Sequence, residues 1–180
     1  MATTPAWFRA FKALVYVAVV INVGVFMRAA DDPFAPKAID QLGWVIILAV
    51  FEWETRRLPP GGQLTRISLP ALAFELVGYG CALFALAHYV AIRDPVEIGN
   101  ALAWLAISAL IWIDLFDPEG ASSGSRVIVR GVLYATTFGC ALWWGITGAW
   151  LDFWDAAIWI ICFFVIELNI FGVPAAGLRR

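Results

Sequence analysis

The chain alternates between long apolar runs and short segments of polar, proline and glycine residues. A helix needs roughly 20 apolar residues to cross a hydrocarbon core of about 30 Å. Helix breakers stand between the runs, as in Pro59-Pro60-Gly61-Gly62. Most of the runs lack the continuous polar face of a helix that lies flat on a membrane. The pattern therefore predicts six membrane-spanning helices, over residues 7–27, 39–58, 69–92, 96–116, 127–150 and 153–171.

Composition leads to the same class of protein. Of the 180 residues, 62% are hydrophobic and 14% are charged. A soluble domain averages about 45–50% apolar and about 25% charged residues. The net charge of -2 also leaves no basic field to hold the phosphates of a nucleic acid. We therefore expect an all-α membrane protein, with residues 1–180 in one transmembrane domain, in contact with the lipid bilayer and with no nucleic-acid partner.

Basic residues gather on one side of the six predicted spans. Lys and Arg mark cytoplasmic loops. The side that holds both termini carries Arg9, Lys12, Arg56, Arg57, Arg66, Arg126, Arg130, Arg179 and Arg180. The other side carries Arg28, Lys37 and Arg93, together with the loop acids Asp31, Asp32, Asp40, Asp94, Glu97, Asp152 and Asp155. This distribution predicts a multi-pass protein of a bacterial-type inner membrane, with both termini in the cytoplasm.

The first run has a second interpretation. Arg9 and Lys12 precede it and Ala29-Ala30 follows it, as in a secretory signal peptide. Cleavage would leave five spans and place the amino terminus outside. We expect the run to be retained as a span.

Two sets of similar segments indicate an internal repeat. Tyr79–Phe84 and Phe138–Trp143 both read aromatic-Gly-Cys-Ala-Leu-aromatic. Trp44, Trp104 and Trp159 each precede two further polar or aromatic residues, by 8 and 10 positions in every case. The pattern predicts three tandem two-helix hairpins. The alternative is chance similarity in a chain rich in Ala, Leu, Val and Ile.

Two partial family resemblances follow from short segments. Arg130-Gly131-Val132-Leu133 with Phe138-Gly139 resembles a hairpin of the HdeD-type membrane proteins, which are also built from three helix pairs. The resemblance covers one hairpin and not the acidic ends of the other helices. Glu52–Arg56 with Phe84-x-x-x-His88 resembles the intramembrane CAAX-type proteases, but the paired glutamates and second histidine of that family are missing. Neither resemblance identifies a family.

Acidic and amide residues gather in the cytoplasmic half of the predicted spans. They are Glu52, Glu54, Glu75, Asp114, Glu167 and Asn169. In one interpretation these residues reach the interface or pair with nearby bases, as Glu54 does with Arg57 one turn later. In the other, Glu75 and Glu167 line an internal polar pocket and carry a proton or a cation. The outer half has little comparable, apart from Asn22 and Asn100.

Other candidate chemistry is sparse. Five tryptophans lie deep in the predicted spans, and they predict either contacts with a flat apolar ligand or helix packing. They are Trp104, Trp112, Trp143, Trp144 and Trp159. His88 is the single histidine and no C-x-x-C pair is present, so the sequence predicts no metal site and names no cofactor.

Two functions fit these features. The first is a small transporter or channel-like protein, with an acidic pocket on the cytoplasmic side that handles protons or small cations. The second is a non-catalytic subunit or assembly factor, which binds a membrane protein partner or forms a homo-oligomer. Catalysis is not expected, because the His–acid pairs and metal clusters of intramembrane enzymes are missing.

Overall fold

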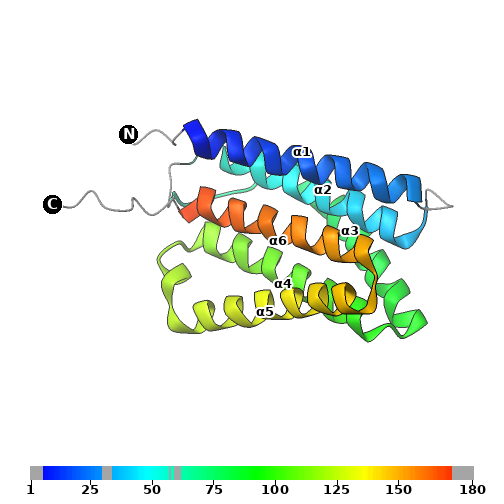
Figure 1. Cartoon of the computed structure of the whole chain (residues 1–180). Helices are drawn as coiled ribbons and strands as arrows, with labels where there is room; N and C mark the ends of the chain where they lie inside the picture. The colour runs from blue at the N-terminus through cyan, green and yellow to red at the C-terminus, as the bar shows by residue number, and fades with distance from the viewer. Residues whose placement is uncertain (1–5, 30–33, 57, 59–61, 172–180) are drawn as a thin grey trace.

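The computed structural model describes residues 6–29, 34–56, 58 and 62–171, with side chains up to Leu168. These residues form six long helices, which confirms the all-helical prediction (Figure 1). The helices are α1 (Ala6–Ala29), α2 (Pro36–Thr55), α3 (Leu69–Ile92), α4 (Pro95–Phe116), α5 (Gly124–Thr147) and α6 (Trp150–Phe171). A 3₁₀ turn, η1 (Gly120–Ser122), connects α4 to α5.

Four of the helices, α1, α3, α4 and α5, are long and apolar enough to cross a membrane. The chain therefore has the helices of a multi-pass membrane protein. The other two long helices, α2 and α6, carry charged residues near both of their ends. Those charged residues are Lys37, Asp40, Glu52 and Glu54 in α2, and Asp152, Asp155 and Glu167 in α6. Their crossing of the bilayer stays a prediction.

Helix bounds shift by three residues between α5 and α6, as they also do in α2. Gly148 has φ +85°, a left-handed conformation that glycine adopts without a Cβ clash, and it ends α5 at Thr147. The sequence pattern predicts the boundary about three residues later. The early turn places Asp152 inside the first turn of α6, where it contacts a neighbouring helix.

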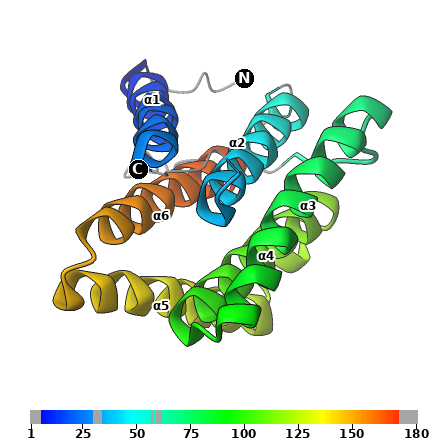
Figure 2. The ribbon, with the colours of Figure 1, turned by 90° about the vertical axis from the view of Figure 1, so that its right-hand side faces the viewer.

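Turned by 90° from Figure 1, the bundle shows α1 beside α6 and α3 beside α4 (Figure 2). Each helix packs on its neighbours in sequence, and α1 also packs on α6. Trp44, Trp104 and Trp159 meet in the core around Phe163, with Trp44 6.4 Å from Trp104 and 6.5 Å from Trp159 between ring centroids. The three even-numbered helices therefore supply the aromatic centre of the bundle.

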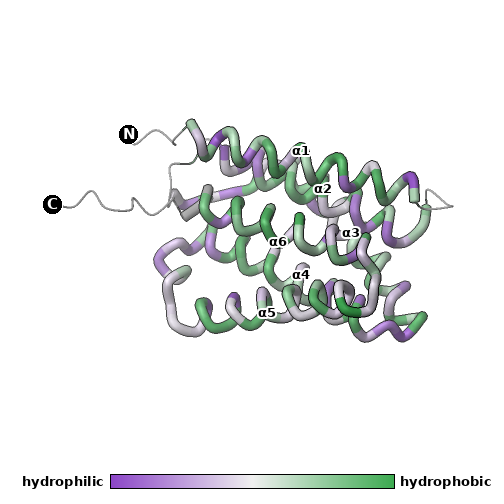
Figure 3. Tube along the Cα trace, in the orientation of Figure 1, coloured by the Kyte–Doolittle hydropathy of each residue, from purple (hydrophilic) through white to green (hydrophobic). Residues whose placement is uncertain are grey.

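The even-numbered helices all begin at one end of the bundle and finish at the other. We call the end where they begin the Lys37 end, and the end where they finish the Asp114 end. Hydrophilic segments gather toward both ends, while hydrophobic ones dominate the middle (Figure 3). Helices α2 and α3 approach closely at Gly43 and Gly78, where a Cβ on Gly43 would lie 2.7 Å from the carbonyl oxygen of Gly78.

Candidate functional site

At the Asp114 end, Glu52 is held by two residues of α1. The Nζ atom of Lys12 lies 2.6 Å from Glu52 Oε2, and the hydroxyl of Tyr16 donates to the same carboxylate at 3.0 Å. The neighbouring Glu54 instead accepts hydrogen bonds from Ser68, with 2.6 Å between Ser68 Oγ and Glu54 Oε1. The predicted partner Arg57 lies outside the described residues. Both glutamates of α2 are thus already bonded within the protein.

Asp114 and Glu167 share one basic residue of α5. Asp114 is fully buried, and its carboxylate binds Arg126 at 3.0 Å and also Arg130. Arg130 Nε lies 3.3 Å from Glu167 Oε1, and the Tyr134 hydroxyl donates to that oxygen at 3.0 Å. The two acids therefore belong to one network of ion pairs. The side chain of Asn169 lies outside the described residues.

Glu75 differs from these acids, because the described part of the chain gives it no basic partner. Its side chain is 4% exposed, and its Oε1 accepts a hydrogen bond of 2.6 Å from Trp112 Nε1. Its Oε2 is buried and has no hydrogen-bond partner. Glu52 and Glu75 therefore make separate contacts, while Asp114 and Glu167 come together. A common pocket for the four acids stays a prediction.

The exposed loop after α4 adds one acid to the Asp114 end. Arg126 Nη2 lies 2.5 Å from Asp117 Oδ2, and the Gly120 amide donates to the same side chain. These hydrogen bonds stabilise the carboxylate and hold the pKa of Asp117 below its usual value. Because Asp117 is solvent-exposed, this contact closes the loop without forming an internal site.

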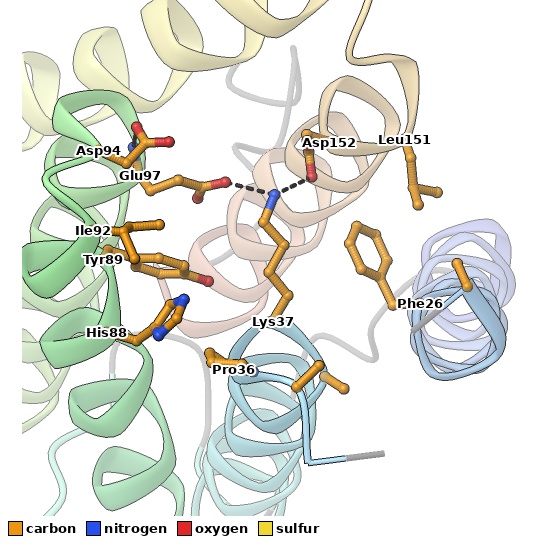
Figure 4. Close-up of a pocket in the computed structure, with 13 residues that line it drawn as sticks. Phe26, Pro36, Lys37, His88, Tyr89, Ile92, Asp94, Glu97, Leu151 and Asp152 are labelled. Carbon is orange, nitrogen blue, oxygen red and sulfur yellow. Dashed lines mark hydrogen bonds and ion pairs between the residues drawn. The ribbon is translucent and has the colours of Figure 1, made fainter. Parts of the chain in front are cut away.

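At the Lys37 end, one ammonium group bridges two carboxylates from different helices. Lys37 Nζ lies 2.6 Å from Glu97 Oε1 and 2.7 Å from Asp152 Oδ1 (Figure 4). The Lys37 side chain is 40% exposed, whereas those of Glu97 and Asp152 are 10% and 24% exposed. The sequence pattern places these three residues in or beside outer loops, but the structure places all three in helices that meet.

One turn deeper lies a second polar layer. Asp155 accepts hydrogen bonds from Asn22 at 2.6 Å and from Gln41 at 2.8 Å. Gln41 in turn accepts a hydrogen bond of 2.9 Å from Trp159 Nε1, which ties this layer to the aromatic centre. The Oδ1 atom of Asn100 is buried and has no hydrogen-bond partner. This layer therefore retains an unused acceptor inside the bundle.

The two layers enclose a small polar pocket of about 20 Å³, which we call the axial pocket. Its lining consists of Phe26, Lys37, Asp40, Gln41, Tyr89, Glu97, Asn100, Trp144, Asp152 and Asp155. A volume of this size accommodates about one water molecule. A larger cavity of about 470 Å³ adjoins it and shares Phe26, Lys37, Tyr89, Glu97 and Asp152 with its lining.

Six residues of the axial pocket hold matching positions in α2, α4 and α6. Lys37, Glu97 and Asp152 each precede the core tryptophan of their own helix by seven residues. Asp40, Asn100 and Asp155 each precede it by four. These offsets were the signal by which sequence comparison could have found the pocket, because seven and four residues upstream lie on nearly the same helix face as the tryptophan.

The five tryptophans proposed as ligand contacts have different surroundings. Trp104 and Trp159 lie in the aromatic core, and Trp112 stacks on Phe51 with 4.6 Å between ring centroids. Trp144 is buried and lines the axial pocket, whereas Trp143 is 53% exposed. Packing within the protein thus accounts for the positions of the first three. Contact with a ligand stays a prediction.

Within the described residues, no group of three or more His, Cys, Asp and Glu side chains is placed to hold a metal ion. Helix N-termini favour carboxylates, and Glu97 and Asp152 both stand in the first turn of their helices. The site therefore combines stabilised carboxylates with an ammonium group.

Comparisons with protein-family models, curated proteins and solved structures find no match for the chain.

Proposed function

We propose that the chain is a small transporter or channel-like membrane protein that moves protons or small cations. The observation that carries the proposal is the axial pocket, in which carboxylates outnumber ammonium groups. Asp40, Glu97, Asp152 and Asp155 face a single Lys37 in its lining. Ionisable groups are costly in a membrane and, when they face the interior of a bundle, they are typical of ion and proton pathways.

A second station for the proton or cation is proposed at the Asp114 end. Glu75 and Glu167 are the carriers there, supported by Asp114, Glu52, Glu54 and Asn169. The unpartnered Oε2 of Glu75 supports this assignment, since that atom is buried and accepts no hydrogen bond. In the predicted orientation, the Asp114 end faces the cytoplasm and the axial pocket faces outward.

The aromatic centre separates these two stations. Trp44, Trp104, Trp159 and Phe163 are each 6% exposed or less. Such a packed layer excludes water, so flux requires these rings to move. We also propose that the three hairpins are repeats, because each supplies one residue to the seven-position set and one to the four-position set of the axial pocket.

Proton flux into proteoliposomes tests the function. Vesicles that contain the purified chain and a pH-sensitive dye should acidify under an imposed potential, while protein-free vesicles should not. Glu75→Gln and Asp155→Asn should lower the flux to the protein-free level, and Asp117→Asn, on an exposed loop, should leave it unchanged. Unchanged flux in both Glu75→Gln and Glu167→Gln would exclude these two residues as carriers of the proton or cation.

The competing function is a non-catalytic membrane subunit or assembly factor. It requires a protein partner or a second copy of the chain to cover part of the apolar surface. Purification in mild detergent separates the two proposals. A stable co-purifying partner together with the lack of flux would favour the subunit, whereas an isolated chain with intrinsic flux would favour the transporter.

A further inference from the structure

We propose that the cavity beside Lys37 binds a small organic ammonium compound, whose ammonium group replaces that of Lys37 between Glu97 and Asp152. The inference deepens the proposed function by naming a substrate class, and it rests on that function in placing cations at the Lys37 end. Binding is measured without flux, so the two proposals fail separately.

The geometry of the ion pairs carries the first step. Glu97 and Asp152 come from α4 and α6, and they hold one ammonium nitrogen at 2.6 and 2.7 Å. An ammonium group has three donors and two of them are used here. The carboxylates are the more buried partners, while Lys37 is the more exposed one. The carboxylates therefore form a fixed cradle, and the long side chain of Lys37 is the part that can leave it.

Charge selects the sign of the ligand. Asp94 also lines the cavity, where its carboxylate accepts hydrogen bonds from the amides of Val96 and Glu97 at the start of α4. Three carboxylates thus face one ammonium group in this lining, with Asp40 and Asp155 one turn deeper. An added cation is attracted by this surplus, and an added anion is repelled.

Size and wall chemistry select an organic cation over a bare ion. The cavity of about 470 Å³ lies within the range of about 300–1,000 Å³ typical of small-molecule sites. Phe26, Tyr89, Ile92 and Leu151 supply apolar wall (Figure 4). Aromatic faces attract cations, and alkyl walls accept a hydrocarbon substituent. The fitting ligand is a primary amine in its ammonium form, with one small apolar group.

Calorimetric titration of the purified full chain with 2-phenylethylammonium tests the site. We expect saturable binding to the wild type. Lys37→Met removes the competing ammonium group, and this variant should bind the probe about tenfold more tightly. Glu97→Gln and Asp152→Asn should each weaken binding about tenfold. The neutral probe 2-phenylethanol should not bind, because it lacks the charge that the cradle recognises.

Lys12→Met is the matched control. Lys12 also pairs with a carboxylate, but with Glu52 at the opposite end of the bundle. This variant should bind 2-phenylethylammonium as the wild type does. If Glu97→Gln does not fold, Lys37→Met still tests the proposal, since this variant is expected to have a higher affinity for the probe. Equal affinity of Lys37→Met and the wild type, or equal binding of 2-phenylethanol, would overturn the proposal.

The ammonium group has two sources, a free amine or the headgroup of phosphatidylethanolamine. Titrations in nanodiscs of phosphatidylethanolamine and of phosphatidylglycerol distinguish them. Weaker probe binding in phosphatidylethanolamine supports the site and identifies the lipid headgroup as its occupant. Equal, saturable binding in both lipids supports the site and identifies a free amine. Loss of saturable binding in both nanodiscs would refute the site.

Discussion

The two ends of the bundle bury charge in opposite ways. At the Asp114 end, Asp114 meets two arginines, and Glu52 meets Lys12. At the Lys37 end, a single ammonium group serves Glu97 and Asp152, and further carboxylates lie one turn deeper. At the Asp114 end, Glu52, Asp114 and Glu167 therefore have basic partners and Glu75 is the exception, while the Lys37 end has a surplus of acid.

We assign the ion pairs of the Asp114 end mainly a role in stability, and the acids of the Lys37 end mainly the proposed role in binding. Ion pairs that are buried within the protein are costly to break. Unmatched carboxylates and a buried amide oxygen without a partner, as at Asn100, leave ligand positions unfilled. We therefore expect substitutions to change stability most at the Asp114 end, and binding most at the Lys37 end.

The largest effect on stability should come from Asp114→Asn. It removes the charge that Arg126 and Arg130 share inside the bundle, and breaking a buried pair of this kind costs about 3 kcal/mol. Unfolding of the variant in mixed micelles, followed by circular dichroism, measures the loss. Asp117→Asn is the control, because its carboxylate is exposed and its removal should cost much less. A free energy of unfolding equal to that of the wild type would mean that the Asp114 end is not held by these ion pairs.

A smaller effect of opposite sign is expected from Asp40→Asn at the Lys37 end. Asp40 lines the axial pocket together with Glu97, Asp152 and Asp155. An amide of the same shape avoids placing a carboxylic acid in this desolvated, acidic lining, so the variant should have a free energy of unfolding higher by about 1 kcal/mol. The same micelle titration measures the gain. A loss as large as that of Asp114→Asn would show that the two ends do not differ in this respect.

The smallest effect should be the pH dependence that Asp117 contributes. Hydrogen bonds from Arg126 and Gly120 lower its pKa in the folded chain, so the carboxylate stabilises the folded state only while it is ionised. The contribution is complete above the ordinary value of 3.8 and is lost as the pH falls below it. The difference in stability between the wild type and Asp117→Asn should be constant from pH 7 to about pH 5 and shrink below about pH 4. A difference that changes between pH 5 and 7 would assign the effect to another group.

Much of the helical architecture could be predicted from local patterns. Hydropathy and helix breakers located six helices, and the predicted range 69–92 matches α3. The α5–α6 boundary was harder to locate, because only backbone geometry shows that Gly148 adopts positive φ. The equal sequence spacings after Trp44, Trp104 and Trp159 also indicate a shared environment, and the structure brings these rings together.

The candidate site was predicted less completely. The acids of the Asp114 end were identified, but their partners lie on other helices, as Lys12 does for Glu52 and Arg130 for Asp114. The sequence pattern places Glu97 and Asp152 among outer loops, since each follows a breaker or a turn. Their joint contact with Lys37 depends on how three helix ends pack, and no local pattern contains that information.

The apolar character and the lengths of the helices follow from the chain alone, because they depend on the identity and order of neighbouring residues. Which charges meet depends on contacts between residues far apart in the chain, such as Lys37 with Asp152 and Asn22 with Asp155. The sequence pattern places Glu97 and Asp152 beside loops, but in the structure both contact the ammonium group of Lys37. Packing of α2, α4 and α6 is the physical cause of that difference.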